Sequence, residues 1–155
     1  MAGDASLVSM SAPLARRRFT LASRVALVPY LLAVSLIVWL PGDDAEAVTG
    51  IVATTARMLE TWGIPFGFGY PVLEFTANIA LFVPFGVLAS AAWPALQAWK
   101  VVAAGAATSI LIEVVQIALP TRYPTVSDVI ANTLGAAVGV VIVVLMRRRV
   151  SPTRD

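Results

Sequence analysis

The 155-residue chain contains no cysteine and no histidine. Their absence excludes disulfide bonds, thiolate chemistry, cysteine- or histidine-based zinc sites and acid–base catalysis by imidazole. Charged residues are also scarce, at 13% against 59% hydrophobic residues. A soluble domain needs about 25% charged residues, because its surface faces water. The composition therefore predicts a small integral membrane protein, in which any chemistry must use carboxylates, amides, hydroxyls and arginine.

Four long apolar runs predict an all-α, polytopic membrane protein whose four transmembrane helices form one bundle. Each run has roughly the ~20 residues that cross a bilayer as a helix. A soluble helical protein is the alternative, but a polar stripe would then interrupt each apolar run. The predicted spans cover residues 21–40, 71–92, 99–119 and 127–146.

The bundle is expected to form a single domain over residues 21–146. Residues 1–20 are predicted to be a disordered cytoplasmic tail, and residues 147–155 a second, basic tail. Between the first two spans, residues 44–62 carry apolar side chains at helical spacing. This spacing predicts an amphipathic helix on the outer membrane surface. The segment 63–71 follows, and its many glycines and prolines predict a loop without regular structure.

The distribution of basic residues predicts that both termini are cytoplasmic. Basic residues precede the first span, lie between the second and third, and follow the fourth. With four crossings these segments share one side, which the positive-inside rule assigns to the cytoplasm. We therefore expect a multi-pass protein of the cell membrane. Arg16-Arg17-Arg18 before an apolar run also resembles a cleavable export signal, although three further spans argue against cleavage.

Ionisable and amide side chains gather at one end of the last three spans. Within each span two of them are three or four residues apart, so they share one helix face. Because the third span runs outward and its neighbours run inward, all these faces reach one level. Polar groups are costly in a membrane, so they predict a functional pocket that opens to the outer leaflet. The residues are Glu74 and Asn78, Glu113 and Gln116, Asp128 and Asn132, with Arg122 in the last loop.

Each of these residues also has a structural interpretation. Thr125-Val-Ser-Asp128 fits a capping box, and Glu74 lies in a first helical turn where the helix dipole favours an anion. The amides fit hydrogen bonds between helices. Glu113 is harder to explain, because it lies near the negative end of its helix dipole and needs a partner or a proton. Arg122 is the nearby cation in the sequence.

Small residues on the same faces predict close contacts between helices. Gly135 and Gly139 form a small-xxx-small pattern on the face that carries Asp128. In the third span, Gly105 and Ser109 continue the face of Glu113. The predicted packing positions are Gly86, Gly105, Gly135 and Gly139.

The polar residues lie in motifs that resemble the VanZ-like family over residues 71–146. The resemblance implies a small bacterial multi-helix membrane protein, and the founding member is associated with resistance to the glycopeptide antibiotic teicoplanin. It supplies no agreed biochemical activity, and this chain has Glu74 where the family pattern often has aspartate. The motifs are Glu74-x-x-x-Asn78-Ile-Ala-Leu-Phe-Val-Pro84-Phe-Gly86, Ile112-Glu113-Val-Val-Gln116, Arg122, and Asp128-Val-Ile-Ala-Asn132-Thr-Leu-Gly135.

The leading functional hypothesis is a pocket that binds the headgroup of a lipid or cell-wall precursor. Arg122 would contact its phosphate or carboxylate, the amides would orient sugar or peptide groups, and Glu113 would balance Arg122. A membrane-embedded enzyme with Asp128 or Glu113 as general base, a small transporter and a structural cluster remain alternatives. Membrane lipids are the expected partners, with no cofactor and no nucleic acid. No dedicated metal-binding loop motif is present, but three carboxylates with amide oxygens also suit magnesium or calcium, so binding of a divalent cation is left open. Whether the protein is an enzyme and which oligomer it forms are left open.

Overall fold

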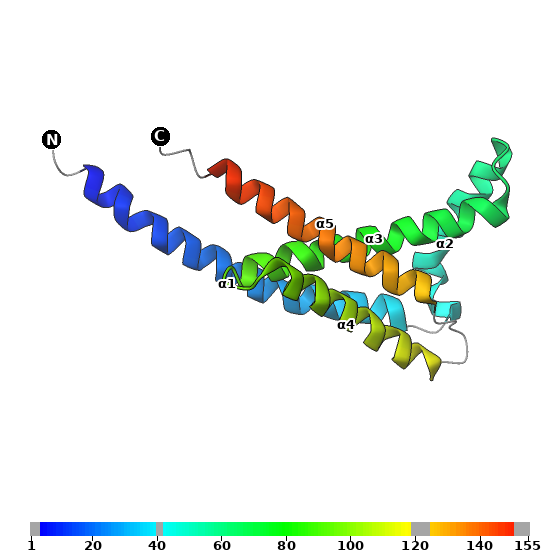
Figure 1. The fold of residues 1–155 in the computed structure, drawn as a ribbon. Coiled ribbons are helices and arrows are strands. Elements are labelled where there is room, and N and C mark those ends of the chain that lie inside the picture. The colour runs from blue at the N-terminus through cyan, green and yellow to red at the C-terminus, as the bar shows by residue number, and fades with distance from the viewer. Residues whose placement is uncertain (1–3, 40–41, 119–124, 151–155) are drawn as a thin grey trace.

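The protein is a helical bundle in a computed structural model that describes residues 4–39, 42–118 and 125–150 (Figure 1). Every helix except α2 contains a segment long and apolar enough to cross a membrane, namely Arg17–Ile37, Phe66–Ala92, Ala98–Ile117 and Val126–Arg149. The predicted all-α class with four possible spans is therefore confirmed. The helices are α1 (Asp4–Trp39), α2 (Gly42–Thr61), α3 (Phe66–Ala92), α4 (Ala98–Ile117) and α5 (Val126–Val150).

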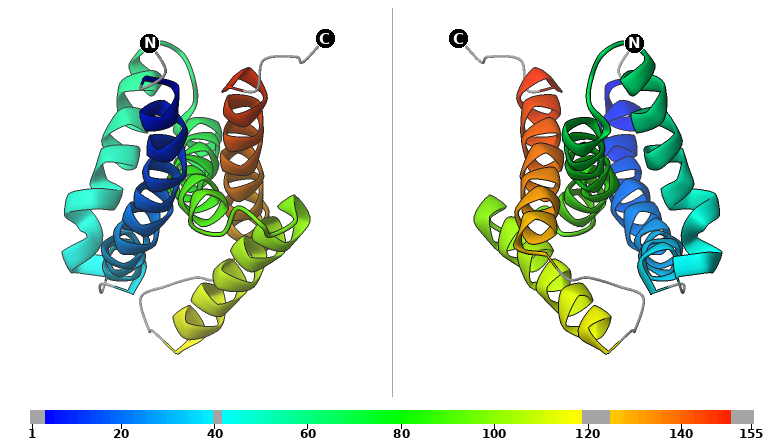
Figure 2. Two further views of the ribbon diagram at one scale, coloured as in Figure 1. Left: turned by 90° about the vertical axis from the view of Figure 1, so that its left-hand side faces the viewer. Right: turned by 90° about the vertical axis from the view of Figure 1, so that its right-hand side faces the viewer.

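Helix α3 lies in the middle of the bundle, between α1 and α5 (Figure 2). Its most extensive contacts are with α5, while α4 packs mainly on α5 and α2 on α3. The start of α1 and the end of α5 lie at one end of the elongated molecule, and α2 lies across the other (Figure 1). The end of α4 and the start of α5 belong to that second end, which we call the polar end because it carries the predicted polar residues.

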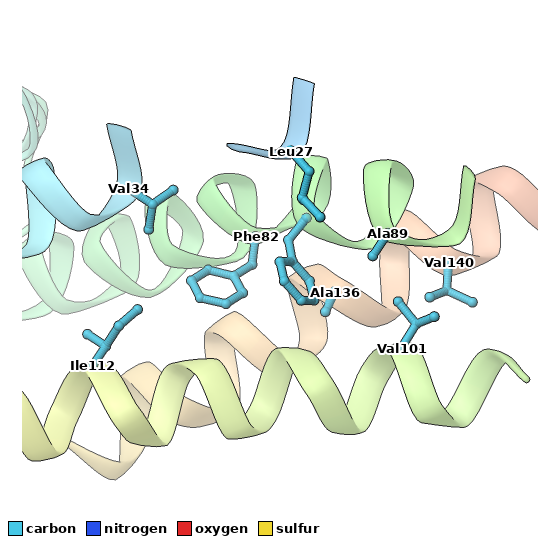
Figure 3. Close-up of a cluster of buried hydrophobic side chains, with 9 residues drawn as sticks. Leu27, Val34, Phe82, Ala89, Val101, Ile112, Ala136 and Val140 are labelled. Atoms are coloured by element: carbon cyan, nitrogen blue, oxygen red, sulfur yellow. The ribbon is translucent and has the colours of Figure 1, made fainter. Parts of the chain in front are cut away.

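The core is a band of apolar side chains contributed by α1, α3, α4 and α5 (Figure 3). Phe82 of α3 is 1% exposed, and Val34 of α1 and Ile112 of α4 lie on its side of the cluster, to which Ala136 of α5 also belongs. Large apolar side chains on the outward faces, such as Leu32 and Leu111, are exposed. In a membrane these faces contact lipid tails, so the bundle relies on close packing between helices rather than on removing apolar surface from water.

Glycines let α3 and α5 approach until their backbones touch. A Cβ atom added to Gly135 would overlap the Ile79 carbonyl oxygen, and one added to Gly139 would overlap the Val83 carbonyl oxygen. From the other side, a Cβ on Gly86 would overlap the Ala136 carbonyl oxygen. A Cβ on Gly105 of α4 would lie 2.7 Å from the Cβ of Ala136. All four glycines predicted to pack thus lie where a side chain has no room.

A tyrosine links α1 to the middle of α3. Pro84 has no N–H, so the carbonyl of Ala80 loses its donor within the helix. At the next carbonyl along, the Tyr30 hydroxyl of α1 donates a 2.7 Å hydrogen bond to Leu81. Polar groups from a neighbouring helix commonly supply such bonds near membrane prolines. The bond fixes α1 against the turn of α3 that the proline interrupts.

A Schellman motif ends α2 and turns the chain towards α3. Gly63 has a φ of 87°, a left-handed conformation that glycine adopts without strain. Its N–H donates to the Glu60 carbonyl, and the Ile64 N–H donates to the Leu59 carbonyl. These two bonds satisfy the last carbonyls of α2. The predicted amphipathic helix over 44–62 is observed as Gly42–Thr61, and its position at a membrane surface stays a prediction.

Three segments predicted as tails or as a loop are helical in part. Helix α1 begins at Asp4, within the predicted tail 1–20, because extending an existing helix through Ala, Leu and Arg requires no new nucleation. Helix α3 begins at Phe66, within the predicted loop 63–71. There the Phe66 and Tyr70 rings stack one turn apart, with centroids 5.5 Å apart. Helix α5 likewise continues to Val150, into the predicted tail 147–155.

Candidate functional site

The polar end brings six of the seven predicted site residues onto three neighbouring helices. Arg122 lies outside the residues that the structure describes. Buried members come from α4 and α5, because Glu113 is 8% exposed, Gln116 9% and Asn132 4%. Asn78 and Asp128 are half-buried, and Glu74 is exposed. We refer to Glu74, Asn78, Glu113, Gln116, Asp128 and Asn132 as the polar cluster.

A direct hydrogen bond joins the two predicted pairs on α3 and α5. The Asn78 side-chain amide donates to the Asp128 carboxylate, with Nδ2 and Oδ1 2.7 Å apart. The two residues are separated by 50 positions in the sequence. A bond to an ionised acceptor is among the stronger hydrogen bonds in proteins. It therefore fixes the start of α5 against α3 at the polar end.

The start of α5 has a capping arrangement completed by a different helix. Thr125 Oγ1 accepts the Asp128 backbone N–H at 3.1 Å, as the predicted capping box requires. In a capping box the third helical residue would return a bond to the N–H of the cap residue. Here Glu113 Oε2 of α4 accepts the Thr125 N–H instead, at 2.8 Å. The Asp128 carboxylate is thereby left to accept Asn78.

This arrangement supplies Glu113 with the partner that the sequence says it needs. A carboxylate near a helix C-terminus is unfavourable there, but Glu113 faces the N-terminus of α5, where the dipole is positive. The backbone donor is therefore one partner of Glu113 in the described part of the chain. Whether Arg122 also pairs with Glu113 stays a prediction.

One buried hydrogen-bond acceptor in the polar cluster has no partner. Asn132 Nδ2 donates to Ser109 Oγ at 2.9 Å, between α5 and α4. Asn132 Oδ1 is buried and has no bonding partner among the described residues. Asn132 is one turn further along α5 than Asp128. An unpaired buried amide oxygen costs about 1–3 kcal/mol.

Glu74 lies at the exposed rim of the polar cluster. The Tyr70 hydroxyl donates to Glu74 Oε1 at 3.4 Å, one turn apart on α3. The charge of Asp128 acts on both Glu74 and Glu113, so Asp128 lies within electrostatic range of each of these two carboxylates. Three nearby carboxylates attract cations and hydrogen-bond donors. Among the described residues, no group of three histidine, cysteine, aspartate or glutamate side chains is arranged to hold a metal ion.

The VanZ/LLP1 family model matches residues 27–147 of this chain, a range that contains all six described residues of the polar cluster. The chain belongs to the VanZ/LLP1 family. The resemblance noted from the motifs is confirmed, and the match extends further towards the N-terminus, into the first predicted span. Neither the curated proteins nor the solved structures contain a match.

Three contributors to this VanZ-like polar cluster were not predicted as site residues. Ser109 was expected only to continue a packing face, although its position four residues before Glu113 places it on the face of the polar cluster. Thr125 was expected to cap its own helix, and nothing local indicates that its N–H binds α4. Tyr70 lies four residues before Glu74, a spacing that permits their hydrogen bond.

Proposed function

We propose that the polar cluster binds the headgroup of a membrane lipid or of a lipid-linked cell-wall precursor. The observation that carries this proposal is the meeting of carboxylates and amides from three apolar helices at one end of a bundle. Keeping such groups in a membrane is costly, and they mark binding or transport sites by default. Asp128 accepts a hydrogen bond from Asn78, and Glu113 accepts one from the Thr125 N–H. Each carboxylate has two oxygens with several acceptor sites, so both can accept further hydrogen bonds from a ligand.

The chemistry of the polar cluster favours a ligand that presents hydrogen-bond donors. Glu74, Glu113 and Asp128 are acceptors when ionised, and Asn132 Oδ1 is a further acceptor with no partner in the described chain. Sugar hydroxyls and ammonium groups supply such donors. Phosphate would instead need a cation, for which Arg122 is the sequence-based candidate. A headgroup that carries both hydrogen-bond donors and a phosphate would therefore match the acceptors of the polar cluster and Arg122.

We further propose that the polar end faces the outer leaflet and that both termini are cytoplasmic. The basic residues at the opposite end of the bundle, near the start of α1 and the end of α5, support this orientation through the positive-inside rule. A protein that holds a cell-wall precursor at the outer leaflet would change how much of it a glycopeptide antibiotic reaches. An effect on teicoplanin susceptibility is therefore part of this proposal.

Native mass spectrometry of the purified protein tests headgroup binding. We expect a co-purified lipid on the unmodified protein and its loss from Glu113→Gln and Asp128→Asn, because both substitutions weaken acceptors. Glu60→Gln is the matched control, since Glu60 is an exposed carboxylate on α2 outside the polar cluster. Equal lipid retention by all three folded variants would contradict the proposal. A retained lipid that is chemically converted with time would indicate an enzyme instead.

A further inference from the structure

The described charges are separated between the two ends of the bundle. The acidic side chains Glu60, Glu74, Glu113 and Asp128 belong to α2 or to the polar end. Of the described basic side chains, only Arg57 of α2 shares that end. The others lie on residues 17–24 of α1, at the start of α4 and at the end of α5, towards the end of the molecule opposite α2 (Figure 1). We call this group the basic end: Arg17, Arg18, Arg24, Lys100, Arg147, Arg148 and Arg149.

Two arginines of the basic end are held in place by the last turn of α3. Arg24 Nε of α1 donates to the Ala92 carbonyl at 3.0 Å, and Arg147 Nη2 of α5 donates to the Ser90 carbonyl at 2.7 Å. Cations at a helix C-terminus stabilise it through the helix dipole. A guanidinium has five N–H donors, so the bond from Nε leaves donors of Arg24 for a further acceptor. The site is thus pre-organised before any ligand arrives.

Tryptophans mark the same level as a membrane interface. The Arg24 guanidinium lies 5.8 Å from the Trp93 ring centre, and the Lys100 ammonium lies 5.7 Å from that of Trp99. Trp93 is 41% exposed and Trp99 64%. Exposed tryptophans beside basic residues at the end of apolar helices are typical of the headgroup layer. In a membrane, this pairing with tryptophan would place the arginines at the depth of lipid phosphates.

We propose that the basic end binds the phosphate groups of anionic phospholipids, with Arg24 and Arg147 as its fixed contacts. Exposed Arg17, Arg18, Arg148 and Arg149 add charge around them. Basic clusters next to transmembrane helices attract anionic lipids, and a planar guanidinium matches the oxygens of a phosphate. This site is separate from the polar cluster, and it does not depend on the proposed function of that cluster.

The test compares lipid binding in detergent micelles by native mass spectrometry, with phosphatidylglycerol as the anionic lipid and phosphatidylcholine as the zwitterionic lipid, whose phosphate charge is balanced by its ammonium group. We expect preferential retention of phosphatidylglycerol. The double variant Arg24→Gln/Arg147→Gln should lower its apparent affinity about tenfold or more, since two nearby charges are lost. Arg57→Gln is the matched control at the opposite end and should change the affinity less than about twofold.

Three results would overturn the proposal: equal retention of both lipids, an equal loss in Arg57→Gln, or complete displacement of the lipid by inorganic phosphate. The last would show that free phosphate, rather than a lipid, is the ligand. If the double variant fails to fold, Arg148→Gln/Arg149→Gln replaces it, because these exposed residues lie beyond the bonds to α3. That pair should weaken phosphatidylglycerol binding about threefold, and an unchanged affinity would contradict the assignment.

Discussion

Asn78 on α3 donates a 2.7 Å hydrogen bond to the Asp128 carboxylate on α5, across the most extensive helix contact in the protein. Each residue also belongs to a polar pair on its own helix. The bond is therefore part of both the α3–α5 contact and the polar cluster. Ligand binding at the polar cluster and the stability of the α3–α5 contact should depend on one another.

A double-mutant cycle measures this bond. Asn78→Ala and Asp128→Ala should each destabilise the bundle, and the double variant should lose less than their sum. Coupling energies between membrane helices average about 0.6 kcal/mol and reach about 1.7 kcal/mol, and we expect the upper part of that range for a bond to a carboxylate. Unfolding in mixed micelles by SDS titration gives the energies. Strict additivity would show that the bond contributes no coupling.

The contact of Glu113 with the Thr125 N–H predicts that two substitutions of Glu113 differ in their effect on the start of α5. Glu113→Gln keeps an acceptor and should protect the start of α5 nearly as well as glutamate. Glu113→Ala leaves the N–H unpaired and should cost about 1–3 kcal/mol. Hydrogen exchange over residues 125–129 reads this out directly. The control is Val114→Ala, at an exposed neighbouring position, which should leave exchange unchanged.

The glycines between α3 and α5 should not tolerate even one methyl group. Gly135→Ala and Gly139→Ala must push the helices apart, because the added Cβ would overlap backbone atoms that cannot rotate away. Overpacking of this kind costs about 1–3 kcal/mol. Gly67→Ala is the matched helical control, since a Cβ there meets nothing within 4 Å. Equal thermal stability of the three variants would disprove this packing.

Gly63 should be sensitive to alanine for a different reason. No atom lies within 4 Å of an added Cβ, but the φ of 87° is strained for alanine. The expected cost is about 1 kcal/mol, because alanine resists the left-handed conformation. Gly50→Ala, in open space within α2, should instead stabilise or leave the protein unchanged. Neither added Cβ meets another atom, so a difference between the two variants in thermal unfolding reports backbone strain and not steric overlap.

Introduced cysteines can test the proposed orientation without background, since the chain has none. A membrane-impermeant maleimide added to intact cells should label Glu60→Cys on α2. Arg148→Cys near the end of α5 should react with the maleimide only after the cells are permeabilised. Both positions are exposed, so protection by folding does not explain a difference. The reverse pattern would place the polar end in the cytoplasm.

The sequence alone determined the four apolar spans, the helical class and the faces that carry the polar pairs. The length of an apolar run and the 3.6-residue helical period are local properties, so they need no knowledge of neighbouring helices. Glu74 with Asn78, and Asp128 with Asn132, were therefore assigned to shared faces correctly. The packing glycines were recognisable for the same reason, because small residues recur on those faces.

Only the tertiary structure decided which groups meet. The capping sequence before α5 predicts that Asp128 closes its own box, yet Glu113 from α4 does so, and Asp128 binds Asn78 of α3. Helix formation across Phe66–Pro71 also overrides the local glycine and proline signal. These outcomes depend on competition between groups far apart in sequence. The approach of three helices resolves that competition, which no local pattern encodes.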